Sequence, residues 1–329
     1  MVPAVVALAV SLLPGTLMAA RGQGSAGAIL SRLPLGARSQ SLGGAQGALP
    51  GTVEAWTANP AALSALGSPQ VEAVYHQGVS DVVYSGVMAG APLSYGLSAG
   101  ASFQQFSAGT IEAHDYLGGT TSADLQEDTA GSLGACWAPG PLSVGAAGRY
   151  YRSTLLGTDS ASAMMFDLGV LLALEAGGAP SYEGEPATPP WRLRFGAAAC
   201  NLGSDSGYGK KPLGEDPPPT SVRFSGTAGR AVSGVLSALT ALEVDVPRTT
   251  ARPQARAGFE IRRAGLVEVA VRGGGLLRED GGIPCAGGGL SVRGIFADYA
   301  WVGPNGPFSA THHVSFGVSI GDLLARRAE

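Results

Sequence analysis

Residues 36–66 read GARSQSLGGAQGALPGTVEAWTANPAALSAL, and this stretch decides how the rest of the chain is interpreted. It contains Gly43 and Gly44, which permit backbone conformations and close approaches that other residues do not. It then reaches Asn59, Pro60 and Ala61. Asn is favoured at the N-cap of a helix and Pro at its first position. We therefore expect a short helix at about residues 61–65, although these residues alone would also fit an ordinary strand, loop and helix.

The composition points to apolar surface that is spread along the chain. Of 329 residues, 45% are hydrophobic, 14% are charged and 51 are Gly. Soluble domains usually carry about 25% charged residues. The net charge of −4 and the pI near 5.6 argue against a nucleic-acid partner, which needs a clustered basic face.

The N-terminus has the pattern of an export signal. The apolar run at 4–13 is too short to span a bilayer as a helix, and small residues follow it. No Lys or Arg precedes the run, which departs from the usual signal. We expect residues 1–22 to be a cleaved signal peptide, so the protein is exported.

Beyond residue 67 the chain reads as short strands separated by turn residues. Fifteen segments qualify: 71–77, 82–91, 94–106, 110–115, 130–138, 142–155, 161–174, 191–201, 221–229, 235–246, 254–262, 266–276, 284–293, 295–302 and 312–320. Bacterial outer-membrane barrels have an even number of strands. We therefore predict an all-β fold, a transmembrane antiparallel up-and-down β-barrel of about 14 strands. Its expected parts are a plug at 23–68, the barrel at 69–321 and a tail at 322–329.

Alternation within the strands supports this barrel. In the last strand Val314, Phe316 and Val318 share one face, and His313 and Ser315 share the other. A closed sheet in lipid needs apolar groups outside and polar groups around the lumen. The charges expected to face the lumen are Arg194, Arg223, Glu243, Asp245, Arg256, Glu260, Glu268, Arg272, Arg293 and Asp298. The aromatic residues expected in interfacial girdles are Tyr75, Tyr84, Trp137, Tyr151, Trp191, Tyr299 and Trp301.

Two polar, Gly- and Pro-rich stretches, 175–190 and 203–219, are expected to be the long connections. They flank the single strand 191–201, whose two ends face opposite sides of the membrane. Long loops usually lie outside the cell, so one of the two must depart from that rule.

Both ends of the chain resemble the PorV/PorQ family, within the wider group of FadL-like outer-membrane barrels. The similar residues are Gly43-Gly44-Ala45, Trp56 and Asn59-Pro60-Ala61, and the strands at 296–301 and 311–316. The resemblance implies an outer-membrane barrel whose plug is anchored by Gly43, Gly44, Asn59, Pro60 and Ala61. It implies a type IX-like secretion role in which the barrel, surrounded by outer-membrane lipid, receives exported cargo proteins. The alternatives are a FadL-like passive transporter of small hydrophobic ligands and a soluble exported β-protein.

No enzymatic chemistry is expected. His312 and His313 are neighbours on a strand, so they face opposite sides and cannot share a metal without a bulge. Cys136, Cys200 and Cys285 are odd in number and far apart, which fits wall residues rather than disulfides or a metal site. The triplets 273–275 and 287–289 are expected to permit kinks or the close approach of a plug. We predict no catalytic residue, metal or cofactor.

Overall fold

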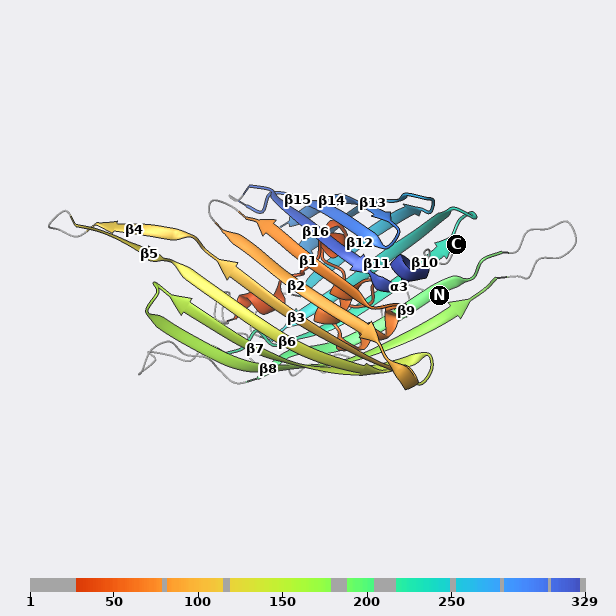
Figure 1. Ribbon diagram of the computed structural model, residues 1–329, viewed down its shortest axis with the longest axis horizontal. Coiled ribbons are helices and arrows are strands. Elements are labelled where there is room, and N and C mark those ends of the chain that lie inside the picture. The colour runs from red at the N-terminus through yellow and green to blue at the C-terminus, as the bar shows by residue number, and fades with distance from the viewer. Residues whose placement is uncertain are drawn as a thin grey trace, which may run out of the picture.

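The computed structural model describes residues 28–78, 82–114, 119–178, 188–203, 217–248, 253–278, 281–306 and 309–325. The expected signal peptide at 1–22 lies outside these residues. The described strands form a closed antiparallel barrel in the order β1-β16-β15-β14-β13-β12-β11-β10-β9-β8-β7-β6-β3-β2 (Figure 1). The predicted 14-stranded up-and-down barrel is therefore confirmed. It closes where β1 pairs with β16, from Gln70 opposite Ser319 to Gln77 opposite His312.

The strands of the wall follow one another along the chain as hairpins. Their bounds are β1 Gln70–Gln77, β2 Val83–Pro92, β3 Leu97–Ser107, β6 Gln126–Trp137, β7 Leu142–Leu155, β8 Asp159–Ala176, β9 Trp191–Gly203, β10 Ser221–Ala231, β11 Leu236–Pro247, β12 Gln254–Arg263, β13 Glu268–Arg278, β14 Gly281–Val292, β15 Ile295–Val302 and β16 Thr311–Ser319. After β16 the chain turns into a short helix, α3, Ile320–Ala325, so the last strand ends before residue 321.

One expected wall strand lies outside the wall. Strand β4, Thr110–His114, pairs with β5, Thr120–Asp124, as a separate two-stranded sheet. Hydrogen bonds from Ala108 N to Gln126 O and from Leu125 N to Gly109 O continue the β3–β6 ladder into this hairpin. The hairpin projects from the end of β3 and β6, at the left of Figure 1. The prediction of a membrane strand at 110–115 was wrong, because β4 extends the barrel beyond its rim.

The two ends of the barrel differ in their connections. At one end, here called the turn end, strands are joined through residues 93–96, 138–141, 232–235, 264–267 and 293–294. The opposite end, here called the loop end, has short connections at 156–158 and 279–280, longer ones at 204–220 and 303–310, and the projecting β4–β5 hairpin. β8 and β9 are joined at the turn end and β9 and β10 at the loop end. The connection through 175–190 is therefore at the turn end, and the connection through 203–219 is at the loop end.

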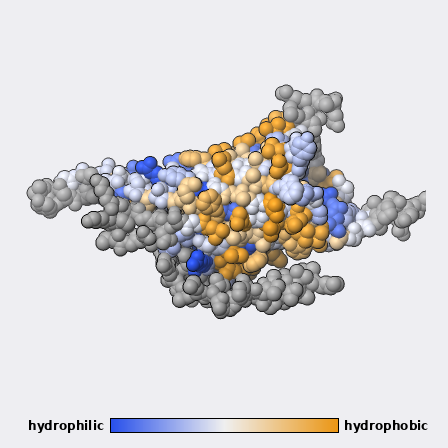
Figure 2. Space-filling model, turned by 90° about the horizontal axis from the view of Figure 1, so that it is seen from below, coloured by the Kyte–Doolittle hydropathy of each residue, from blue (hydrophilic) through white to orange (hydrophobic). Residues whose placement is uncertain are grey.

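Large apolar side chains cover the outside of the wall. Leu133, Val271 and Phe316 are 72%, 61% and 62% exposed, and they lie on three separate strands. Figure 2 shows such residues gathered across the middle of the molecule, with hydrophilic residues toward both ends. An apolar surface of this extent on a closed sheet fits contact with hydrocarbon, and the strands are not stacked as a sandwich.

The girdle prediction was wrong for Tyr84 and Tyr151. Both are buried, because they occupy the inward positions of β2 and β7. Inside the barrel the Tyr84 hydroxyl contacts Gln104 Oε1 at 3.4 Å. Tyr75, Trp137, Trp191 and Tyr299 are exposed and Trp301 is half-buried.

The N-terminal segment lies inside the barrel as a plug, which we define as residues 28–69. Its elements are η1 Ile29–Arg32, α2 Ala37–Ser41, η2 Val53–Thr57 and η3 Pro60–Ala65. Trp56, Leu63 and Leu49 of the plug are fully buried, so they help to form the core. No helix among the described residues has the length and apolarity to cross a membrane.

Candidate functional site

The Asn-Pro-Ala motif fastens the plug to three strands. Asn59 is the N-cap of η3, where its Oδ1 accepts a hydrogen bond from Ala61 N at 3.1 Å. Its Nδ2 donates to Val170 O of β8 at 3.1 Å. The predicted short helix at 61–65 is thus confirmed as a 3-10 helix that begins at Pro60.

A glycine socket, defined as Gly145, Gly169 and Gly196, receives this motif. A Cβ at Gly145 would lie 2.5 Å from Ala61 N, and one at Gly196 would lie 2.8 Å from Asn59 Nδ2. At Gly169 it would overlap Asn59 Oδ1. Since real Cβ atoms do not approach other atoms so closely, only glycine leaves room for the motif at these positions.

Glycines also let the first half of the plug meet the opposite side of the wall. A Cβ on Gly274 would lie 2.6 Å from the Leu42 carbonyl carbon, and one on Gly287 would lie 2.6 Å from Ser41 Cβ. Gly43 has a φ of 74° and faces the backbone of Gly275. The triplets 273–275 and 287–289 thus contain positions where the plug approaches the wall closely.

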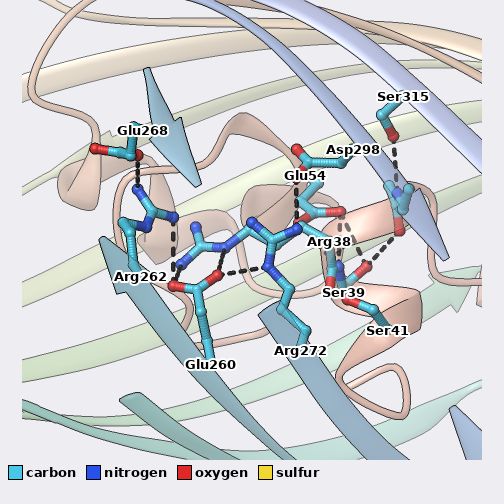
Figure 3. A network of polar contacts seen from close by, with 12 residues as sticks. Arg38, Ser39, Ser41, Glu54, Glu260, Arg262, Glu268, Arg272, Asp298 and Ser315 are labelled. Carbon is cyan, nitrogen blue, oxygen red and sulfur yellow. Dashed lines mark hydrogen bonds and ion pairs between the residues drawn. The ribbon is translucent and has the colours of Figure 1, made fainter. Parts of the chain in front are cut away.

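The first of three ion-pair clusters surrounds Glu260 (Figure 3). Arg38 of the plug donates to both carboxylate oxygens, from Nε at 2.8 Å and from Nη2 at 3.0 Å. Arg272 donates to the same carboxylate at 2.6 Å and also pairs with Asp298. Arg262 extends the cluster to Glu268 at the rim. A bidentate arginine with further charge-assisted hydrogen bonds holds the plug in one orientation.

The second cluster centres on Glu243 and Asp245 of β11. Arg256 pairs with Glu243 at 2.6 Å, and Arg32 of the plug pairs with Asp245 at 3.2 Å. The backbone N–H of Gly47 donates to Glu243 Oε2 at 2.8 Å. This cluster therefore binds the plug through both charge and backbone.

The third cluster lies beside the second, around Arg149 of β7. Its guanidinium pairs with Asp167 at 3.3 Å and donates to Asn201 Oδ1 at 2.8 Å. It also donates to Ser31 O of the plug at 3.0 Å. The plug is thus attached to the wall on several sides by buried polar contacts, each of which is costly to leave unmade.

The structure places most of the predicted charges inside the barrel. The buried ones are Arg223, Glu243, Asp245, Arg256, Glu260, Arg272 and Asp298. Arg194 is half-buried on the inward face of β9, and Glu268 lies partly exposed at the turn end. The prediction for Arg293 was wrong: it is exposed in the turn between β14 and β15, because β14 ends at Val292 and alternation stops there.

Sequence reasoning missed several members of the clusters. Arg149 and Asp167 occupy inward positions of predicted strands, so the same alternation would have identified them. Arg38 and Glu54 lie in the plug, where no periodicity marks a buried charge. His76 stacks on His313 with ring centroids 3.8 Å apart, a contact that exists only because β1 closes on β16.

Burial and neighbouring charges shift the pKa values of two charged groups in the plug, Arg38 and Glu54. Burial alone would lower the pKa of the Arg38 guanidinium, but the charge and hydrogen bond of Glu260, together with the charges of Glu54 and Asp298, raise that pKa above its ordinary value. Burial raises the pKa of the Glu54 carboxyl, while Arg38 acts in the opposite direction. Arg38 therefore stays charged, so its pairing with Glu260 does not depend on ordinary changes in pH.

A cavity of about 480 Å³ opens between the plug and the wall at the loop end. Its walls include the apolar side chains Leu33, Pro34, Leu276, Ile283 and Val302. Its polar lining includes Arg32, Arg256, Arg278, His76 and His313, and no described residue of the lining is acidic. The cavity combines apolar sides with hydrogen-bond donors, which suits a small apolar or amphipathic molecule.

The three cysteines are free and buried against the interior. The Cys200 thiol donates to Ala58 O at 3.3 Å and the Cys136 thiol to Ala61 O at 3.5 Å, so both contact the plug. Among the described residues no three His, Cys, Asp or Glu side chains are grouped as a metal site would need.

Comparison with known proteins identifies the fold. No protein-family model and no curated protein matches the chain. The P. putida toluene transporter TodX matches with a TM-score of 0.52 at 12% identity, over 86% of this chain and 98% of that chain. The Ralstonia pickettii toluene transporter TbuX matches with a TM-score of 0.50 at 12% identity, over the same shares of the two chains. A Pseudomonas aeruginosa FadL homologue has a TM-score of 0.47 at 9% identity, over 87% of this chain and 99% of that chain. The chain is a closed 14-stranded antiparallel β-barrel, and it shares this fold with the toluene transporters TodX and TbuX.

Proposed function

We propose that this protein is a passive outer-membrane transporter of small hydrophobic molecules, which enter through the loop-end cavity. The observation that carries the proposal is the cavity itself, with five apolar lining residues above a plug that fills the lumen. The apolar exterior and the likeness to the toluene transporters TodX and TbuX support a place in the outer membrane. The loop end would face outside, because short turns of such barrels face the periplasm.

Two neighbouring leucines offer a matched test of this proposal. Leu276 lines the cavity, whereas Leu277 points away from the lumen and is 54% exposed. Leu276→Trp should slow the flux of toluene or a small fluorescent aromatic into proteoliposomes by about tenfold, because the larger side chain fills the path. Leu277→Trp should leave flux within about twofold, since it adds an aromatic ring on the lipid side. Equal flux through both variants and the unchanged protein would reject the cavity as the route.

We propose a secretion-associated role, of the kind implied by the PorV/PorQ resemblance, as the second candidate. The observation in its favour is the β4–β5 hairpin, which carries Thr110, Glu112 and Asp124 beyond the rim at the loop end. Such a hairpin has two unpaired edges among the described residues and can accept an extended segment of another protein.

Replacing residues 109–125 with a two-residue Asn-Gly turn tests this second role. The closed wall ends at β3 and β6, so the shortened barrel should fold and conduct aromatics at the unchanged rate. A secretion role predicts that exported proteins sharing a C-terminal export domain fail to reach the cell surface in this variant. Their normal appearance at the surface, measured by labelling of whole cells, would contradict it.

A further inference from the structure

A second apolar hollow lies on the outside of the wall at the turn end, separate from the lumen. It measures about 610 Å³ and lies against β14, β15, β16 and α3. The hollow forms because the small side chain of Ala297 on β15 lies between the larger side chains of Leu290 on β14 and Phe316 on β16. Leu323 of α3 contributes to the lining. We call this hollow the α3 groove.

Arg293 lies on the rim of the α3 groove in an unfavourable backbone conformation. It forms a two-residue turn with Gly294, and the two φ angles are 51° and 83°. Hairpin turns with two positive φ values prefer Asn-Gly, because a larger side chain at the first position is strained. Arg293 makes no hydrogen bond or ion pair with the described residues, so no internal contact compensates for this strain. A guanidinium in this strained position, on the rim of an apolar groove, is available to a ligand outside the chain.

We propose that the α3 groove binds one anionic phospholipid, with an acyl chain along Leu290, Ala297 and Phe316 and the headgroup phosphate on Arg293. A guanidinium matches a phosphate with paired, charge-assisted hydrogen bonds. The groove belongs to the lipid-facing wall, so acyl chains already surround it. The turn end would lie in the periplasmic leaflet, where phospholipid headgroups stand at the level of Arg293. Positive charge beside an apolar hollow selects an anionic lipid over a zwitterionic one.

Native mass spectrometry of the folded full chain, released from detergent micelles, tests this directly. Micelles would contain either phosphatidylglycerol or phosphatidylcholine with identical acyl chains. We expect the unchanged protein to retain one phosphatidylglycerol at least about fivefold more than phosphatidylcholine, because both headgroups carry a phosphate but only phosphatidylcholine places a cationic choline beside Arg293. Arg293→Asn should remove this preference and, because Asn suits the turn, should not weaken the fold.

Two further variants separate the charge from the groove. Arg263→Asn removes an exposed arginine at the same end of the barrel but outside the α3 groove, so it should keep the preference. Ala297→Phe fills the groove and should lower retention of both lipids. Equal retention of the two lipids, an unchanged preference in Arg293→Asn, or a protein dimer in place of bound lipid would each overturn the proposal. The flux assay with Leu276→Trp is independent of this result.

Discussion

Glu260→Gln is expected to lower the free energy of unfolding by about 3–5 kcal/mol, the largest effect of any single charge in the lumen. Glutamine preserves the size of the side chain but removes the charge that Arg38 and Arg272 share. Both guanidiniums are buried, so each would lose an ion-pair partner where water does not readily replace it. Urea unfolding in detergent micelles, followed by tryptophan fluorescence, would measure the loss.

The matched control for this prediction is Glu268→Gln. Glu268 pairs with the same Arg262 that contacts Glu260, but its side chain is 35% exposed. Exposed ion pairs contribute about 0–1 kcal/mol, so this change should be small. Adding Arg38→Met to Glu260→Gln should recover part of the stability, because it removes one of the uncompensated charges. Equal losses for Glu260→Gln and Glu268→Gln would show that the cluster does not hold the plug.

The second large effect is expected from Gly145→Val, which places a branched side chain in the glycine socket. The first added carbon alone would lie 2.5 Å from the plug backbone at Pro60 and Ala61. Because neither a strand nor the η3 turn can shift freely, we expect a loss of about 3 kcal/mol in unfolding free energy. The plug should also become accessible, which limited proteolysis of the folded barrel would detect as new cleavage within residues 28–69.

Gly148→Val provides the control on the same strand. Gly148 lies on the outward face of β7, and an added Cβ would meet only the Phe166 ring, at 3.8 Å. Valine there faces lipid and is favoured in strands, so stability and protease resistance should stay close to those of the unchanged protein. A plug as protected in Gly145→Val as in Gly148→Val would refute the role of the socket.

Alternation predicted the wall because each strand has one apolar and one polar face, a pattern that a local stretch of sequence contains in full. Alternation wrongly predicted that Arg293 faces the lumen, because a two-residue turn interrupts the strand there. It also wrongly placed β4 in the wall, because the β3–β6 hydrogen-bond ladder continues beyond the rim of the barrel. Tyr84 and Tyr151 were misplaced because residue type was given more weight than their inward positions. The pairing of Arg38 with Glu260 could not be predicted, since the two lie 222 residues apart and no local pattern relates them.

The order of these attachments along the chain constrains how the protein matures. The plug is made first, but Asn59 needs β8, Gly47 needs Glu243 on β11, and Arg38 needs Glu260 on β12. Each of these strand residues is synthesised long after the plug residue that it binds. The plug therefore remains undocked and in contact with water while most of the chain is produced. Its apolar residues, including Leu49, Trp56 and Leu63, are exposed to water during that interval and are buried only on docking. Docking and the pairing of β1 with β16 are therefore late, slow events, and a chain lacking β16 should leave residues 28–69 undocked.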